Sequence, residues 1–174
     1  MMNKQYARAF FDIVREDKTL NEAKESFDVF IDALNSNSDF ALVLNSPKIS
    51  VEDKKELIKN TFKGCLEDFI LFLYVVLDNG RMGKIIGIHS EFVHLYNEEN
   101  KIKVIDVYSV NKLSNEEEMK LLNSLKKYYN GYEVILRNKI DPSVVGGYHI
   151  LVNGISMDLS IKRKIDDLQN YIFN

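Results

Sequence analysis

Residues 69–77 read FILFLYVVL, nine apolar or aromatic residues in an unbroken run. A helix built from this run is apolar on every side, and such a helix is normally enclosed by other helices. The run is far shorter than the roughly 20 residues that a bilayer-spanning helix needs. It therefore predicts the centre of a helical bundle.

Helical periodicity surrounds this run on both sides. Apolar residues recur at three- and four-residue spacing, and breakers such as Pro47 and the pair Asn79-Gly80 separate the segments. Besides the central run, the expected helices cover residues 4–14, 20–34, 40–44, 51–62 and 82–100. We therefore expect residues 1–100 to form a six-helix bundle.

The pattern changes beyond the bundle. Residues 104–110 are rich in β-branched side chains, and Asn153-Gly154 is a strong hairpin signal because that pair readily takes positive φ angles. Further helices are expected at residues 114–129 and 160–172. The predicted fold class is therefore α+β overall, with a small α/β C-terminal portion at residues 101–174.

The composition is that of a globular protein in a reducing compartment. Hydrophobic residues make up 45% of the chain and charged residues 28%, which argues against a disordered or membrane-spanning chain. Cys65 is the only cysteine, so an internal disulfide is excluded. The opening residues, MMNKQYARAF, do not resemble a secretory signal. We expect a cytosolic protein without direct membrane insertion.

The sequence does not predict a catalytic, cofactor-binding or metal site. His89 and His94 are five positions apart on a predicted helix, whereas a shared metal needs a spacing of three or four. His149 has no partner that the sequence can show, and no glycine-rich loop precedes Lys and Ser or Thr. A small-molecule enzyme would need a cluster that forms only in space. We therefore assign no catalytic, cofactor or metal residue.

The distribution of charge argues against a nucleic-acid partner. Residues 1–100 carry 12 Lys and Arg against 17 Asp and Glu, while residues 101–174 carry 11 against 9. Phosphate binding needs clustered basic residues, which the acidic first part lacks. A helical RNA-binding adaptor is the alternative function, since small helical bundles serve in that role, but this acidic surface counts against it.

Five segments of the chain carry a family resemblance. The most specific is IDPSVVGGY at residues 140–148, followed after the hairpin by DLSI at 158–161 and a basic helix. The others are YARAF at 6–10, NSP at 45–47, residues 69–81 with their NGR ending, and SV with LS at 109–114. In this order they resemble the delta subunits of bacterial F-type ATP synthases, the family of the mitochondrial oligomycin-sensitivity-conferring protein. The signature residues of the C-terminal portion are Asp141, Pro142, Gly146, Gly147, Asp158 and Ser160.

The resemblance implies a non-catalytic stator subunit, without a cofactor, that links the catalytic head to the peripheral stalk and resists rotor torque during proton-driven ATP synthesis. The N-terminal bundle would receive the N-terminal helix of an alpha subunit in a groove between its first and fifth helices. The C-terminal portion would engage the b subunits, with one copy per complex at the cytoplasmic face of the cell membrane. Carried over by position, the groove residues are Tyr6, Ala9, Phe10, Ile13, Phe69, Phe72, Leu73 and Val76.

Overall fold

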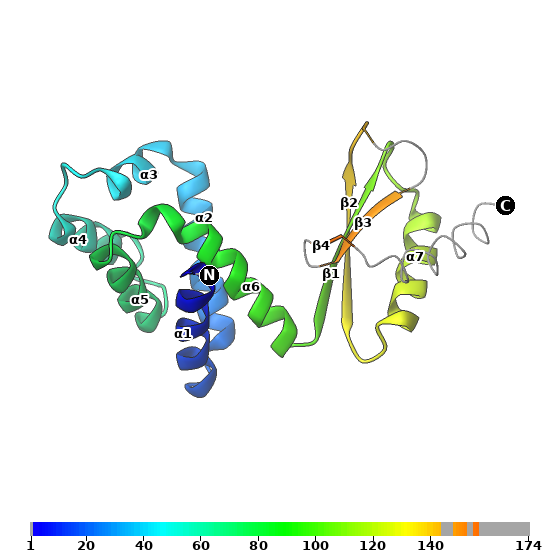
Figure 1. Ribbon diagram of the computed structural model, residues 1–174, viewed down its shortest axis with the longest axis horizontal. Coiled ribbons are helices and arrows are strands. Elements are labelled where there is room, and N and C mark those ends of the chain that lie inside the picture. The colour runs from blue at the N-terminus through cyan, green and yellow to red at the C-terminus, as the bar shows by residue number, and fades with distance from the viewer. Residues whose placement is uncertain (1, 144–147, 153–154, 157–174) are drawn as a thin grey trace. The chain divides into compact units, whose positions relative to one another are not determined.

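A computed structural model describes residues 2–143, 148–152 and 155–156 (Figure 1). The chain divides into two compact units between Tyr96 and Asn97. The sequence analysis placed this boundary four residues later, after residue 100. Helices and strands together confirm the predicted α+β class. No helix among the described residues has the length and apolarity needed to cross a membrane.

The first unit is helical. Its elements are α1 (Met2–Glu16), α2 (Leu20–Ser36), α3 (Ser38–Asn45), α4 (Val51–Thr61), α5 (Glu67–Asp78), the short 3-10 helix η1 (Met82–Lys84) and α6 (Ile85–Glu99), whose last residues belong to the second unit.

Aromatic rings fill the core of the first unit. Phe27 on α2 is fully buried, and its ring centroid lies 5.0 Å from that of Phe69 on α5 and 5.6 Å from that of Phe92 on α6. The ring of Phe10 on α1 lies 6.3 Å from that of Phe27, so four helices meet at one cluster. Burial of large aromatic side chains is the main source of stability for such a core.

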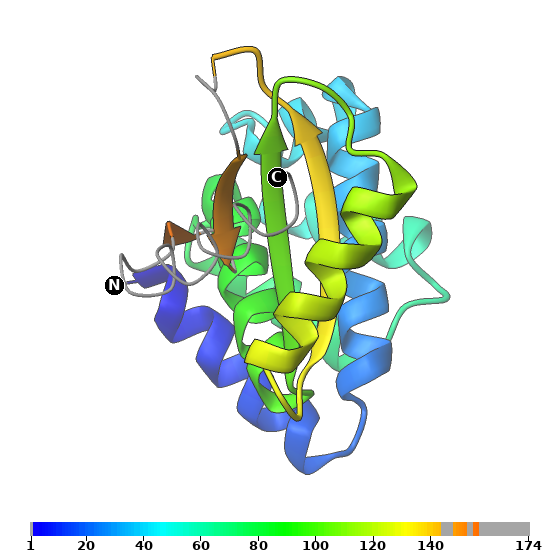
Figure 2. The same cartoon turned by 90° about the vertical axis from the view of Figure 1, so that its right-hand side faces the viewer.

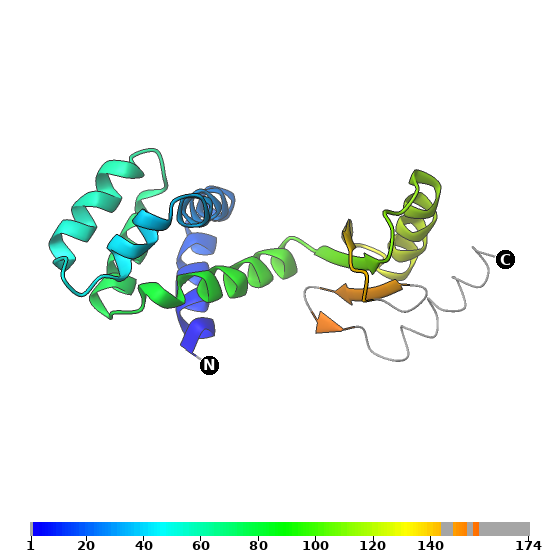
Figure 3. The ribbon, with the colours of Figure 1, turned by 90° about the horizontal axis from the view of Figure 1, so that it is seen from above.

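Only one side of α5 is enclosed by other helices. Phe69, Leu73 and Val76 are completely buried, but Leu71 and Val75 are 52% and 51% exposed. The expectation that the apolar run is enclosed on every side is therefore wrong for one face of the helix. Figure 3 shows the helices of the first unit from above, and within the described residues none of them buries Leu71 or Val75.

In the described part of the second unit, a helix packs against a mixed sheet. Its elements are β1 (Ile102–Ser109), α7 (Asn115–Tyr128), β2 (Glu133–Ile140), β3 (Tyr148–Val152) and β4 (Ile155–Ser156). The strand order is β2-β1-β3-β4, with β1 parallel to β2 and antiparallel to β3. The crossover helix α7 lies on one face of the sheet (Figure 2), where its Leu125 packs with Ile105 and Val134.

Several local predictions for the second unit are confirmed. The Ser114 and Glu117 side chains form the predicted capping box at the start of α7. The strands β3 and β4 pair antiparallel, with Val152 opposite Ile155, as the predicted hairpin requires. The turn residues of the hairpin and the helix expected at residues 160–172 lie outside the described residues.

The side-chain amide of Asn138 in β2 fixes the connection between β1 and α7. The Asn138 Nδ2 donates hydrogen bonds to the Val107 carbonyl (3.1 Å) and to Ser109 Oγ (2.7 Å). Its Oδ1 accepts a hydrogen bond of 2.8 Å from the backbone N–H of Leu113. One side chain thus bonds to three polar groups of β1 and of the loop before α7, and these bonds hold the loop against the sheet.

Asp28 joins α2 to α6. Its Oδ1 lies 2.7 Å from His89 Nε2, and its Oδ2 lies 2.5 Å from Lys24 Nζ. Burial tends to raise the pKa of Asp28, but the hydrogen bonds with Lys24 and His89 outweigh this and hold the pKa below its ordinary value. The ionised form of Asp28 therefore stabilises the fold.

Gly80 closes α5 in a left-handed conformation. Its φ angle is +63°, and the flanking bonds run from Gly80 N to the Leu77 carbonyl and from Arg81 N to the Val76 carbonyl. This is a Schellman motif, which favours glycine. We predict that Gly80→Ala lowers the free energy of unfolding by about 1 kcal/mol in urea titrations, because a Cβ disfavours positive φ.

Gly64→Ala is the matched control for Gly80→Ala. A Cβ at either glycine meets no atom within 4 Å, but only Gly80 has a positive φ. Gly64→Ala should leave stability unchanged or slightly raised, since the substitution restricts only the unfolded chain. Equal losses at the two positions would show that backbone conformation is not the cause.

Replacement of Asp28 gives a pH-dependent loss of stability. A carboxyl whose pKa falls on folding contributes stability above its unfolded pKa and loses it as the pH drops through the folded value. We predict that Asp28→Asn melts below the wild type at pH 7 and that the gap closes below about pH 4. Asp32→Asn, on the exposed side of α2, removes the same charge and should show no such closing gap in the same melting curves.

Candidate partner-binding groove

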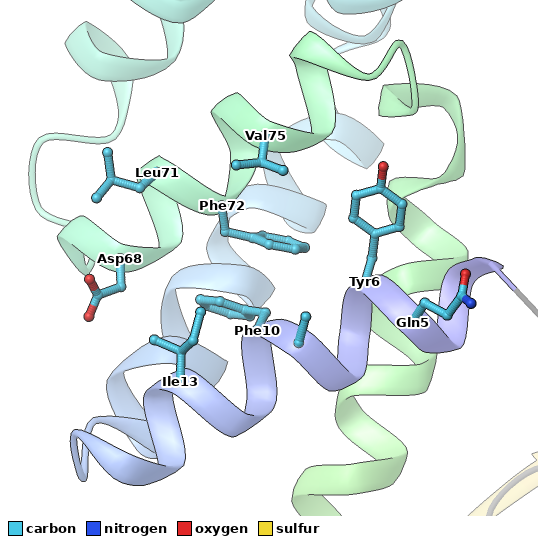
Figure 4. A pocket seen from close by; sticks show the side chains of 9 residues that line it. Gln5, Tyr6, Phe10, Ile13, Asp68, Leu71, Phe72 and Val75 are labelled. Atoms are coloured by element: carbon cyan, nitrogen blue, oxygen red, sulfur yellow. The ribbon is translucent and has the colours of Figure 1, made fainter.

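A groove of about 420 Å³ runs between α1 and α5. Its lining comes only from these two helices (Figure 4). The lining residues are Gln5, Tyr6, Ala9, Phe10 and Ile13 from α1 and Asp68, Leu71, Phe72 and Val75 from α5.

Two stacked phenylalanine rings form the floor of the groove. The ring centroids of Phe10 and Phe72 are 4.5 Å apart with an interplanar angle of 19°. Both side chains are buried, with 2% and 9% of their surface exposed. The floor is therefore part of the packed core, which gives the groove a fixed shape.

The walls of the groove are apolar and accessible. Ile13 on α1 is 53% exposed, and Leu71 and Val75 on α5 are 52% and 51% exposed. On each helix the lining residues recur at spacings of three and four, which places them on one face. Figure 4 shows the Leu71 and Val75 side chains on the α5 wall and Ile13 on the opposite wall. Such a surface offers contact to apolar side chains of a partner.

Five of the eight groove residues named from the sequence line this groove. They are Tyr6, Ala9, Phe10, Ile13 and Phe72. Phe69, Leu73 and Val76 do not, because all three are completely buried and point into the core. The sequence prediction is wrong for these three residues, because they lie on the inner face of α5 and not on the face that lines the groove.

The groove also contains four residues that the sequence analysis missed. These are Gln5, Asp68, Leu71 and Val75. The signal for the α5 residues lies in the acidic side chains at its ends, which are Glu67 and Asp68 at the start and Asp78 at the end. Positions 68, 71, 75 and 78 follow one face of a helix, and Asp68 and Asp78 mark that face as the solvent side.

The C-terminal signature is described only in part. Asp141 Oδ1 accepts hydrogen bonds from the Ser143 N–H (2.9 Å) and hydroxyl (2.7 Å), and these bonds hold the pKa of Asp141 below its ordinary value. The Asp141 N–H donates to the Ser109 carbonyl, and Pro142 is exposed. The signature residues Gly146, Gly147, Asp158 and Ser160 lie outside the described residues.

The groove offers contact surface rather than reactive groups. Asp68 is the one carboxylate in its lining, and among residues 2–143, 148–152 and 155–156 no group of three His, Cys, Asp or Glu side chains could hold a metal ion. Chemically, this arrangement is suited to apolar side chains, from which it would exclude water.

The family model and the relatives compared with this chain agree with one another. The sequence model of the family described as ATP synthase delta (OSCP) subunit matches residues 2–172. The ATP synthase subunit delta of Desulforudis audaxviator is 32% identical over 97% of this chain and 92% of that protein. The subunit delta of Clostridium kluyveri is 28% identical over 97% of this chain and 93% of that protein.

The fold is also found in a solved structure. A chain in the cryo-EM structure of the Toxoplasma gondii mitochondrial ATP synthase hexamer has a TM-score of 0.76 to this chain at 20% sequence identity. The match covers 100% of this chain and 98% of that chain. These comparisons confirm the resemblance that the five sequence segments indicated. The chain therefore belongs to the ATP synthase delta (OSCP) subunit family, whose members are non-catalytic subunits that act as linkers in the stator, or peripheral stalk, of ATP synthase.

Proposed function

We propose that this protein joins the catalytic head of ATP synthase to the peripheral stalk by gripping the N-terminal helix of an alpha subunit in the α1–α5 groove. In this proposal α1–α6 act as one six-helix domain at residues 1–100, and residues 101–174 bind the b subunits. One copy sits at the cytoplasmic face of the cell membrane, held there by its partners. The observation that carries the proposal is the apolar, half-open groove between α1 and α5.

The groove fits the recognition of an amphipathic helix. A helix in a groove presents side chains at positions i, i+3, i+4 and i+7 to an apolar trough. The walls supply three half-exposed apolar side chains, Ile13, Leu71 and Val75. Covering the remaining surface of each contributes about 1 kcal/mol by the usual area relation. The floor adds contact area without rearrangement, because Phe10 and Phe72 are already packed.

The mechanical task explains why apolar contacts are used. A stator must keep the head from turning with the rotor, so the interface between head and stator needs slow dissociation and high stiffness. Buried aromatic and aliphatic anchors slow dissociation, whereas exposed charge pairs mainly change the rate of association. The lining of the groove matches the first kind of contact. Membership of the family supports the proposed contact of the second unit with the b subunits.

Exposed wall residues provide a direct test of the groove. We predict that Ile13→Asp or Val75→Asp weakens binding of a synthetic peptide with the sequence of the alpha-subunit N-terminus at least tenfold by isothermal titration calorimetry. The reason is that each change places a charge where the apolar partner side chains must pack. Because both side chains are about half exposed in the free protein, the fold should persist, as circular dichroism can show.

Leu42→Asp is the matched control for the groove variants. Leu42 lies on α3, outside the groove, and is 69% exposed, so the same change there should leave peptide affinity unchanged. Phe10→Asp is unsuitable as a test because a charge at a side chain only 2% exposed would disrupt the core. Wild-type affinity in both wall variants would rule the groove out as the head-binding site.

A further inference from the structure

A second cavity lies elsewhere on the first unit. It encloses about 550 Å³ and is formed by α2, the end of α4 and the connection from Phe62 to Leu66. None of its lining residues belongs to the α1–α5 groove. The two cavities therefore offer separate surfaces.

The floor of this cavity is apolar and firmly held. Phe62 is 5% exposed, and its ring centroid lies 5.2 Å from that of Phe30 and 5.8 Å from that of Phe40. Ser26 on α2 accepts a hydrogen bond of 2.9 Å from the Leu66 N–H, which ties the connection to α2 across the floor. The cavity is thus a built feature of the packed unit, because both of its walls are fixed to each other.

One edge of the cavity is acidic. Glu22, Glu25 and Val29 recur along α2 at spacings of three and four, and all three line the cavity. Val29 is 47% exposed. Within the described part of the chain, neither glutamate makes a hydrogen bond or an ion pair. Two unpaired carboxylates beside an open apolar side chain call for a partner that is apolar and basic.

We propose that this cavity is a second docking site, and that it receives a basic amphipathic helix of a partner subunit. The line from Glu22 to Val29 extends roughly 10 Å along α2, the length over which a partner helix presents its i, i+3 and i+7 side chains. Apolar side chains of that helix cover Val29 and enter the cavity above Phe62. Its Lys or Arg side chains pair with Glu22 and Glu25.

The two docking sites select different helices. The α1–α5 groove has one carboxylate, Asp68, in an otherwise apolar lining, so it favours a partner by shape and apolar contact. The second cavity adds two carboxylates on one edge, so it discriminates by charge. An acidic amphipathic helix would meet like charges there and is rejected.

Cys65 supplies a probe for this proposal. It lines the cavity, is partly exposed and is the only cysteine of the sequence. The rate at which a maleimide dye labels the full-length protein therefore reports whether the cavity is covered. The ligands are two designed amphipathic helices with the same leucine stripe, one flanked by lysines and the other by glutamates.

We predict that the lysine peptide slows Cys65 labelling at least tenfold at saturation and that the glutamate peptide does not. Glu22→Lys with Glu25→Lys should abolish the protection at low salt, since it reverses the charge of the edge. Glu52→Lys with Glu56→Lys is the control, because it makes the same charge change on exposed positions of α4 and, like Glu22, Glu52 lies in the first turn of its helix.

Labelling of the assembled ATP synthase completes the test. Cys65 should react at least tenfold more slowly in the assembled enzyme than in the free chain, because a partner helix covers the cavity. The proposal is overturned if the lysine peptide leaves the labelling rate unchanged, if both peptides protect equally, or if assembly leaves Cys65 as reactive as before.

Discussion

The stack of Phe10 on Phe72 is the contact on which both the fold and the proposed function depend. On its inner side the pair packs against Phe27 and Phe69 in the core, and on its outer side it forms the floor of the groove. In the proposed complex a partner helix would rest directly on core side chains, which are close-packed and resist displacement. Stability of the first unit and stiffness of the joint have the same physical origin.

The features predicted correctly from the sequence are those set by neighbours in the chain. Helical periodicity, the capping box at Ser114 and the strand pairing beside Asn153-Gly154 all arise from residues a few positions apart. The Asn138 network and the Asp28–His89 contact join residues 25 to 61 positions apart. Spacing carries no information on such contacts, because they depend on which elements become neighbours in space.

The helix α5 shows why the site was only half predicted. In α1 polar residues interrupt the apolar ones, so the helical period retains a contrast that marks the side facing solvent. In α5 the residues from Phe69 to Leu77 are apolar throughout, and the helical period then has no contrast to reveal which face is open. The contrast survives only at the ends, in Glu67, Asp68 and Asp78. The choice between Val75 and Val76 as a partner contact therefore rests on these terminal carboxylates.

A joint that carries torque needs more than one point of attachment. A single helix lying in the α1–α5 groove resists being pulled out, but the apolar walls offer little directional resistance to its sliding or turning about its own axis, because dispersion and hydrophobic contacts are non-directional. A second contact on separate residues of the same rigid unit would remove that freedom. The cavity beside Glu22 and Glu25 is suited to this, since ion pairs fix register where apolar contact does not. On this argument the two cavities divide the work, the groove supplying strength and the acidic edge supplying orientation.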